Sequence, residues 1–384
     1  MGAEEAKVCL YDERLALALE EFCQVAWPSK VRDSRPTTAA AVESASSSVP
    51  RPPTILFMKG QKVVGHVATL PVQLWIGSQA RSAHWLVGFM VLEEYRNGLI
   101  GPLLIKEANR TLDVALSLHV ESTVLRIMKG LKWSHQGLLP QFLKVLNASS
   151  FAENLQLSGV DAMQKSSGGM MGLARSCLSL SPARWVMGWG IAAAQTLWNG
   201  VASLSRRHPS CGEVTEEFGF EDGFTELWET VSKHIGAAVV RDRTYLAARY
   251  GRELDRYRLL TCRDHHRKLL GFCLLKTKTF SDDIRMGNMR VGTIVDCLYD
   301  PRAPEVWQAL LDGAIGMFRA AGSHAVLCTA SLEEVQRVLF ANGFVAIPGN
   351  LNFAIHQRAG SIAELPPLKA WHLMRGDSDA DQNF

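Results

Sequence analysis

The chain has 384 residues, of which 47% are hydrophobic and 21% are charged. This length favours two domains over a single core, and the composition excludes a largely disordered chain. The charge balance is only +3, from 41 Lys and Arg against 38 Asp and Glu, which excludes the broad positive field of a nucleic-acid-binding protein.

Eight cysteines are scattered along the chain. They form no Cys-x-x-Cys pair and no His spacing typical of zinc, so we expect reduced cysteines and no metal site. The first residues, MGAEEAKVCLYDERL, are acidic and lack the basic-then-apolar order of a secretory signal. Ala6 also departs from the myristoylation pattern. We therefore expect a cytoplasmic protein.

The first predicted elements are a short strand and a helix within residues 8–27. Residues 30–53 are small and rich in Pro and Ser, which is typical of a mobile loop. Three strand-like runs follow, then a helix with Pro102 in its first turn and a further apolar strand, VALSLHVE. Residues 122–131 predict another helix, and LLPQFLKVL predicts a strand that closes the first domain near Asn147.

A charge-free run, WVMGWGIAAAQTLWNGVASL, occupies residues 185–204. A run of about 20 residues is long enough to span a bilayer. Gln195, Thr196, Asn199 and several small residues make it less hydrophobic than a typical spanning helix. The favoured interpretation is a buried interdomain helix, and the alternatives are an interfacial membrane helix and a true span.

From Glu213 onward the element order of the first half repeats, without any obvious residue-level repeat. We infer a structural duplication with deep divergence. The tail, GDSDADQNF, is acidic and is predicted to be disordered. The expected division is a first domain over residues 1–154, a linker over 155–212, a second domain over 213–357 and a tail over 358–384.

The string Arg96-Asn97-Gly98-Leu99-Ile100-Gly101 lies between an apolar strand and a helix that opens with Pro102. It resembles the Arg/Gln-x-x-Gly-x-Gly/Ala signature that GNAT acyltransferases carry between strand four and helix three. The Arg and the final Gly match the signature. The middle glycine is displaced to Gly98, and Leu99 takes its usual place.

A second mark of that family is a helix that ends in an aromatic residue. LRIMKGLKW, ending at Trp133, and VLFANGF, ending at Phe344, both look like it. The resemblance implies an α/β (α+β) fold with two tandem GNAT-like domains, the second degenerate, each a mixed, mostly antiparallel sheet flanked by helices. It covers most of residues 8–147 and, more faintly, 215–357. The tandem architecture also resembles proteins of exopolysaccharide pathways and FemAB-type aminoacyltransferases, although no FemAB motif is present.

The turn has the physical properties of a phosphate site. Free N–H groups and the helix dipole favour an anion at a helix N-terminus, glycine permits close approach, and an Arg can add a charge-assisted bond. The resemblance implies that acetyl-CoA or another acyl-CoA binds here as co-substrate. The predicted cofactor-binding residues are Val91, Arg96, Asn97, Gly98, Leu99, Ile100, Gly101 and Leu103. The alternative is an ordinary strand-to-helix turn with a solvated Arg.

Acyl transfer from a thioester to an amine needs a base, a polarising donor and an acid for the leaving thiolate. The Tyr that family members often use as the acid falls on about Met128 and Leu339 here, and neither can protonate sulfur. The candidate catalytic residues are His119 and Glu121, at the carboxyl end of a predicted parallel strand, and Glu94, just before the turn. Solvated or structural roles are the alternatives for all three.

Three further polar residues are weaker candidates. His84 and His135 could line an acceptor pocket, and Asp296 is predicted to be hydrogen-bonded structure that could also border an acceptor groove. In the second copy the matching turn, YDPRAPEVWQALL, has two prolines and no glycine, so we expect no phosphate site there.

These observations favour an acyl-CoA-dependent N-acyltransferase, with acetyl transfer as the expected form. The expected acceptor is a small-molecule amine or amino sugar in polysaccharide or cell-envelope metabolism. The missing Tyr and the displaced glycine leave two alternatives, a non-catalytic protein that keeps the fold for binding or scaffolding, and a FemAB-like aminoacyltransferase. A homodimer and a peripheral membrane contact through residues 185–204 are also left open.

Overall fold

The computed structural model of the chain describes residues 5–28, 52–96, 98–154, 211–283, 286–358, 361–362 and 364–382. Most of the expected loop over residues 30–53, and the whole apolar run over 185–204, lie outside the described residues. Within the described ranges, no helix is both long enough and apolar enough to cross a membrane. The chain divides into two compact units.

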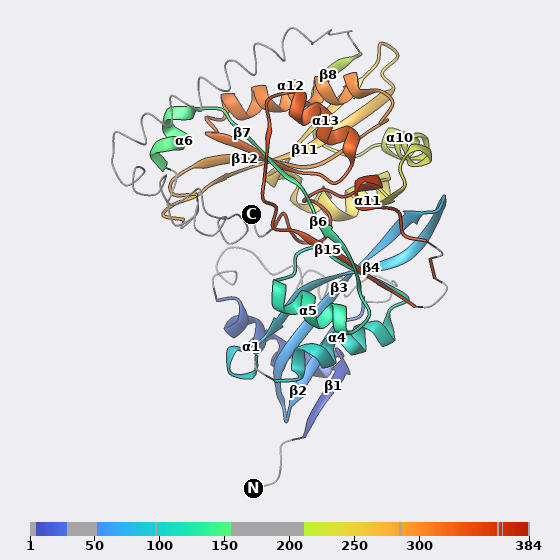
Figure 1. Cartoon of the computed structure of the whole chain (residues 1–384), viewed down its shortest axis with the longest axis vertical. Coiled ribbons are helices and arrows are strands. Elements are labelled where there is room, and N and C mark those ends of the chain that lie inside the picture. Colours follow the sequence, from blue (N-terminus) through green and yellow to red (C-terminus); the bar gives the residue numbers. More distant parts are fainter. Residues whose placement is uncertain are drawn as a thin grey trace, which may run out of the picture. The chain divides into compact units, whose positions relative to one another are not determined.

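The first unit comprises Met1–Leu138, Leu351–Leu365 and Ser378–Ala380 (Figure 1). Its strands are β1 Ala6–Leu10, β2 Ile55–Lys59, β3 Lys62–Ile76, β4 Gln79–Val91, β5 Val114–Ser117, β6 Ser134–Leu138 and β15 Asn352–Gln357. Its helices are the short η1 Glu13–Leu15, α1 Ala16–Ala26, the short η2 Glu93–Tyr95, α4 Ile100–Thr111 and α5 Ser122–Gly130. The helix predicted over residues 122–131 is therefore confirmed as α5.

The sheet of the first unit has the strand order β1-β2-β3-β4-β5-β15-β6. Neighbouring strands are antiparallel except β4 and β5, which are parallel. Successive residues of a strand point to opposite faces, and β3 shows which helix covers which face. A Cβ on Gly65 would lie 2.7 Å from Cγ2 of Ile100 in α4. The next residue, His66, instead lies against Phe22 of α1. The sheet thus lies between α1 and α4, with α5 packed beside α4.

The second unit comprises Leu139–Asn350, Pro366–Asp377 and Asp381–Phe384. Its strands are β7 Gln141–Val145, β8 Glu213–Glu217, β9 Ala237–Val239, β10 Arg258–Arg263, β11 Leu269–Thr279, β12 Arg290–Tyr299, β13 Ala325–Thr329, β14 Val345–Ile347 and β16 Trp371–His372. Its helices are α6 Ala148–Asn154, α10 Gly223–Val231, η3 Ser232–His234, α11 Arg243–Tyr250, η4 Gly251–Arg256, α12 Pro304–Ala320, α13 Glu333–Ala341 and η5 Leu368–Ala370.

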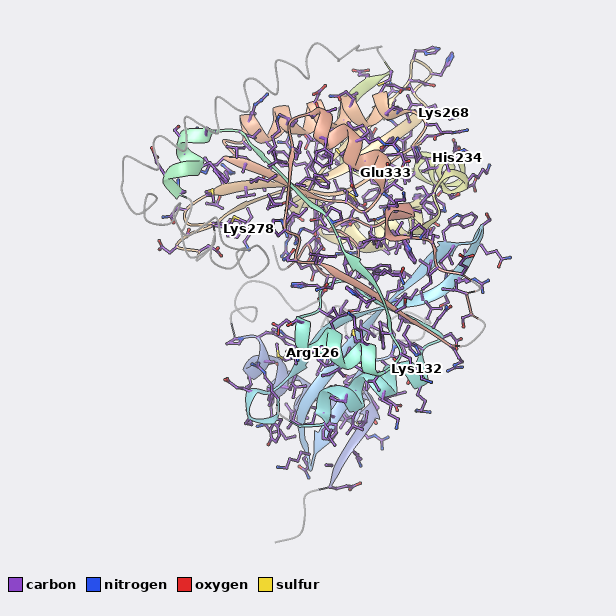
Figure 2. The ribbon with its side chains drawn as sticks, viewed as in Figure 1. Arg126, Lys132, His234, Lys268, Lys278 and Glu333 are labelled. Atoms are coloured by element: carbon purple, nitrogen blue, oxygen red, sulfur yellow. The ribbon has the colours of Figure 1, made fainter. Side chains whose placement is uncertain are left out.

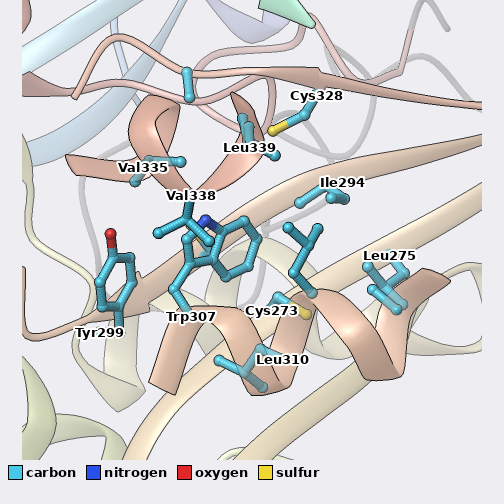
Figure 3. Close-up of a cluster of buried hydrophobic side chains, with 14 of the residues drawn as sticks. Cys273, Leu275, Ile294, Tyr299, Trp307, Leu310, Cys328, Val335, Val338 and Leu339 are labelled. Carbon is cyan, nitrogen blue, oxygen red and sulfur yellow. The ribbon is translucent and has the colours of Figure 1, made fainter. Parts of the chain in front are cut away.

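The sheet of the second unit has the order β14-β7-β13-β12-β11-β10-β8, with β12 and β13 as its parallel pair. Its core forms where α12 and α13 bury their apolar faces on the sheet (Figure 3). Trp307 of α12 is fully buried and stacks on Tyr299 of β12, with ring centroids 6.0 Å apart. The unit thus repeats the hairpin, helix and parallel strand of the first unit, which confirms the duplicated, mixed and mostly antiparallel architecture.

Both of the strand orders given above include a strand from the other half of the sequence. β7 follows β6 directly in the chain, yet it lies between β14 and β13 in the second sheet. β15 comes from the second half and lies between β5 and β6 in the first sheet. The observed division therefore differs from the expected boundaries at residues 154 and 213. The strand predicted to close the first domain instead joins the second sheet.

The tail predicted to be disordered is ordered and buried through Asp381. Asp377 and Asp381 are each 1% exposed. The Arg241 guanidinium donates to Asp377 at 2.7 Å, and that of Arg249 donates to Asp381 at 2.5 Å. Buried carboxylates need such partners because an unpaired charge is costly in a low-dielectric interior. The prediction was wrong because composition alone does not show that distant arginines pair with these aspartates.

Candidate active site

The predicted phosphate-binding turn leads into the start of α4. The helix begins at Ile100, and no side chain caps its N-terminus. Among the described residues, the main-chain N–H groups of Leu99 and Ile100 have no hydrogen-bond acceptor. Leu99 is 74% exposed. This end of α4 therefore combines two main-chain donors that have no acceptor among the described residues with the positive end of the helix dipole.

Two of the predicted donors are already used within the chain. The N–H of Leu103 donates to the carbonyl of Leu99 at 3.0 Å, and that of Gly98 donates to Tyr95 at 3.3 Å. This differs from the expectation that both amides would face a ligand. Asn97 lies outside the described residues. The open donors at the helix start are accordingly those of Leu99 and Ile100.

Arg96 holds the loop before α4 against the end of β4. Its Nε donates to the carbonyl of Val91 at 3.1 Å, and its Nη2 lies 3.8 Å from Sδ of Met90. The residue is nevertheless exposed. In this geometry Arg96 orients the turn, and its remaining N–H groups can still reach an anion.

Strands β4 and β5 pair only briefly before they separate. Their register covers His84 with Ala115 and Trp85 with Leu116. β4 then continues to Val91 while β5 ends at Ser117. Beyond Trp85, the edge of β4 that faces away from β3 therefore has main-chain groups with no strand partner among the described residues. An extended ligand with amide groups can pair with such an edge, as a peptide does when it adds a strand to a sheet.

A β-bulge interrupts β4 at this open edge. On β3, His66 pairs with Met90 but Ala68 pairs with Val87, so β4 carries one extra residue there. Gly88, in the bulge, has φ of 57°, which glycine adopts without strain. The Nδ1 of the fully buried His66 lies 2.8 Å from the carbonyl oxygen of Gly88. Burial lowers the pKa of His66 to about 4, so the ring is neutral at pH 7.

His66 was not among the residues that the sequence singled out. It lies in the run KVVGHVATL, where one His inside an apolar strand is the only signal. Its contact with the bulge depends on the register between two strands, and one sequence does not show that register.

Glu94 lies on the same loop as Arg96, but its carboxylate is directed to Lys62. The two side chains form an exposed ion pair at 3.4 Å. The pKa of Glu94 is lowered, first by a main-chain hydrogen bond and then by Lys62. A base with a lowered pKa accepts a proton less readily. Of the three catalytic candidates, Glu94 is therefore the least suited to deprotonate an amine.

His119 and Glu121 lie in the loop between β5 and α5, beyond the carboxyl end of the parallel strand, and both are exposed. His84 on β4 is partly buried, and burial lowers its pKa. His135 on β6 has Nε2 at 3.3 Å from Oδ1 of Asn352. The structure thus gives His135 a structural partner and leaves His119 and Glu121 at the solvent side.

The corresponding strand separation in the second unit is filled by the chain's own segment Trp371–Asp377. β12 and β13 pair from Val291 to Ile294 and then diverge. Beyond that point the N–H of Gly376 donates to Val295 at 2.8 Å, and Nε2 of His372 lies 2.6 Å from the carbonyl of Cys297. On the other side of the segment, Ala330 forms a β-bridge with Met374. The edge that has no strand partner among the described residues of the first unit is therefore occupied in the second.

Asp296 belongs to this buried arrangement. Both of its carboxylate oxygens accept from Nε of Arg241, at 3.0 and 3.2 Å. The same guanidinium reaches Asp377 through Nη2. Burial raises the pKa of Asp296 to about 6, against the opposing effect of Arg241. The prediction that Asp296 is hydrogen-bonded structure is confirmed.

No protein-family model matches the sequence, and no curated protein matches it. Solved structures do match its fold. A GCN5-related N-acetyltransferase from Anabaena variabilis aligns with a TM-score of 0.55 and 11% identity over 92% of this chain and 73% of the other. An N-myristoyltransferase from Saccharomyces cerevisiae, solved with myristoyl-CoA and inhibitors, aligns with a TM-score of 0.54 and 13% identity over 92% of this chain and 80% of the other. A probable N-acyltransferase from Enterococcus faecalis gives 0.54 and 9% identity over 92% and 72%. The chain has the GNAT fold, in two copies.

In this GNAT fold the two aromatic residues that marked the resemblance are core residues. Trp133 is 4% exposed, and its indole N–H donates to Asn109 at 2.9 Å. Phe344 is 1% exposed. Met128, at the position of the family's frequent Tyr, is buried and carries no dissociable proton. The first GNAT copy thus keeps the open helix start and open strand edge, while the second has lost the strand edge to its own tail.

Proposed function

We propose that the chain is an acyl-CoA-dependent N-acyltransferase with one acyl-CoA site, located in the first copy. The supporting observation is the coincidence of two open features there, the uncapped start of α4 and the unpaired edge of β4. The first suits a diphosphate, and the second suits the amide-bearing arm that links the diphosphate to the thioester. The residues proposed to hold the diphosphate are Leu99, Ile100 and Gly101, with Arg96 as the nearby cation.

An exposed arginine lies next to a residue that borders this helix start. Ile127 of α5 borders Gly101, since a Cβ on that glycine would lie 3.9 Å from Cδ1 of Ile127. Arg126, the residue before Ile127, is exposed (Figure 2). We infer that this cation adds local attraction for the phosphates of CoA, although the net charge of the whole chain is only +3.

The proposed reaction is direct attack of an amine nitrogen on the thioester carbonyl. The C–N bond forms, the C–S bond breaks, and the amine loses a proton to a base while the thiolate of CoA leaves. His119 and Glu121 are the proposed bases, because both are exposed and lie beyond the carboxyl end of β5. A thiol has a pKa of about 8.5, so water can protonate the leaving thiolate near neutral pH without a Tyr at position 128.

The acyl group we propose first is acetyl, and the acceptor is an amine on a small molecule or an amino sugar, in the cytoplasm. The fold is shared with a myristoyl-CoA-bound transferase, so longer chains belong in the same test. The experiment is titration calorimetry of the full chain with acetyl-, octanoyl- and myristoyl-CoA, followed by detection of released CoA thiol with a panel of amines. Binding of one acyl-CoA per chain with thiol release supports the proposal. No binding of any acyl-CoA overturns it.

A non-catalytic binding protein is the second candidate, and the buried Met128 favours it because the usual acid is absent. This candidate predicts acyl-CoA binding without release of thiol for any amine. Transfer of a labelled acyl group to an amine product eliminates it.

A further inference from the structure

His66 connects the face of the first sheet covered by α1 to the open edge of β4. Its ring packs against the rings of Phe22 and Trp27, with centroids 5.8 and 5.7 Å away. Its Nδ1 approaches the carbonyl oxygen of Gly88. A carbonyl only accepts, so Nδ1 carries the proton and donates it. Because burial lowers the pKa of His66 to about 4, the ring is neutral at pH 7 and is held in one tautomer.

The Gly88 carbonyl belongs to the bulge, where the ladder between β3 and β4 loses register. The bond from His66 holds this carbonyl toward the α1 face. At the other end of the same short segment, Arg96 holds the carbonyl of Val91 at 3.1 Å. Residues 88–91 are thus held at both ends by side chains, and the open edge of β4 lies between them.

The bulge also borders the start of α4. A Cβ on Gly101 would lie 3.4 Å from Cζ of Phe89, the residue after Gly88. Because a bulge decides which face the following side chains take, the bond from His66 also fixes the ring of Phe89 against the first turn of α4. A contiguous series of contacts therefore runs from His66 through Gly88 and Phe89 to Gly101.

We propose that His66 is a positioning residue for acyl-CoA: its Nδ1–H fixes the bulge carbonyl of Gly88 and thereby aligns the open edge of β4 with the start of α4. The inference rests on the proposed function of this site. His66 does not touch the reacting atoms in this arrangement, because its ring is fully buried and packs against Phe22 and Trp27. Its effect passes through the main chain of β4 and the ring of Phe89.

The test compares His66→Leu, His66→Asn and His66→Gln in the full chain. Asn places an N–H close to the position of Nδ1, whereas Gln places one close to that of Nε2. We expect His66→Leu to lower kcat/KM for acyl transfer by about 30-fold, since misplacement by about 1 Å costs up to about 100-fold. His66→Asn should recover to within about threefold of wild type, and His66→Gln should stay impaired. His356→Asn is the matched control, because His356 is a partly buried histidine of the same sheet that packs on Trp133.

Three measurements make the result decisive. Circular dichroism confirms that each variant is folded, and calorimetry with acyl-CoA on the wild type tests the proposed function separately. Nitrogen NMR of labelled histidine should show the Nδ1–H tautomer for His66. The inference is overturned if His66→Asn is as impaired as His66→Leu, if His66→Leu matches wild type, or if the Nε2–H tautomer is found. Absence of acyl-CoA binding to the wild type overturns the proposed function and this inference together.

Discussion

The main-chain N–H of Gly376 donates to the carbonyl of Val295 at 2.8 Å, at the point where β12 has separated from β13. Val295 lies where β11 and β12 lose register, between the pairs that Leu274 and Leu275 make. Each copy of the fold therefore has a bulge soon after its parallel pairing ends. In the first copy the bulge carbonyl is bonded by His66, and in the second it is bonded by the tail. This difference is the structural basis for proposing a single cofactor site in the duplicated architecture.

Gly376→Ala should destabilise the second unit. A Cβ at this position would clash with the Tyr250 hydroxyl and lie 3.0 Å from the Val295 carbonyl oxygen. Overpacking of this kind costs about 1–3 kcal/mol of the free energy of unfolding. The control is Gly316→Ala on α12, where no atom lies within 4 Å of the added Cβ. There we expect about 0.5–1 kcal/mol of stabilisation. Urea unfolding measures both, and equal effects of the two substitutions would contradict the account of the tail.

The elements that periodicity predicted are those with strong local patterns. The helix α5 and the strand–turn–helix around Arg96 were predicted because apolar spacing and turn residues lie within one short stretch. The sequence did not predict that β7 joins the second sheet and β15 joins the first. Each strand has the local pattern of a strand that could complete the sheet of its own half. Their destination depends on pairing across more than a hundred residues, for example Ile355 with Leu116.

The candidate site was predicted only where its residues are contiguous. Arg96 and Gly101 belong to a string that can be recognised in one dimension. His66 and Gly88 lie on the two strands of a hairpin. The hydrogen bond between them depends on a β-bulge that no residue pattern predicts. The tail was misjudged for a related reason, since Asp377 is stabilised by Arg241, which precedes it by 136 residues.

Leu99→Glu should weaken acyl-CoA binding while leaving the fold intact. An acidic residue at a helix N-terminus stabilises the helix by about 0.3–1 kcal/mol, so a loss of binding does not come from unfolding. Two unit charges about 8 Å apart at an effective dielectric constant of about 20 interact by about 2 kcal/mol, so we expect the Kd to rise by about tenfold or more at low salt. Leu17→Glu on α1 is the matched control, because Leu17 is 69% exposed and Leu99 is 74% exposed. Similar Kd values for both variants, measured by calorimetry, would argue against a diphosphate at this helix.

Gly65→Ala should displace α4. The added Cβ would lie 2.7 Å from Ile100 and 3.0 Å from Leu104, both of which are buried side chains of α4. We expect about 1–3 kcal/mol of destabilisation, together with weaker acyl-CoA binding, because the helix start moves with the helix. Gly130→Ala at the end of α5 meets no atom within 4 Å and serves as the control. Thermal unfolding with and without acyl-CoA measures both effects. If acyl-CoA raises the Tm of Gly65→Ala by as much as it raises the Tm of wild type, the prediction is wrong and the position of α4 does not control acyl-CoA binding.

His372 should make the second unit sensitive to acid. Burial, and secondarily Arg241, lowers its pKa from 6.5 to about 3. The unfolded chain therefore takes up a proton near pH 6.5 while the folded chain does not, so stability is full above that pH and is lost as the pH falls. Between about pH 7 and pH 5 the loss is about 2 kcal/mol. His372→Gln keeps an N–H near the Cys297 carbonyl but has no such proton uptake. Its free energy of unfolding should fall by about 2 kcal/mol less than that of wild type over this range, and parallel pH profiles would refute the assignment.

The most direct test of the central claim is hydrogen–deuterium exchange of the full chain with and without acetyl-CoA or the acyl-CoA that binds best. The account predicts slower exchange in peptides that cover residues 88–91 and 96–103, because CoA then occupies the edge of β4 and the amides of Leu99 and Ile100. It predicts no change in peptides that cover the corresponding turn of the second copy, residues 299–307. Protection of the second turn, or saturating ligand with no protection at the start of α4, would contradict it.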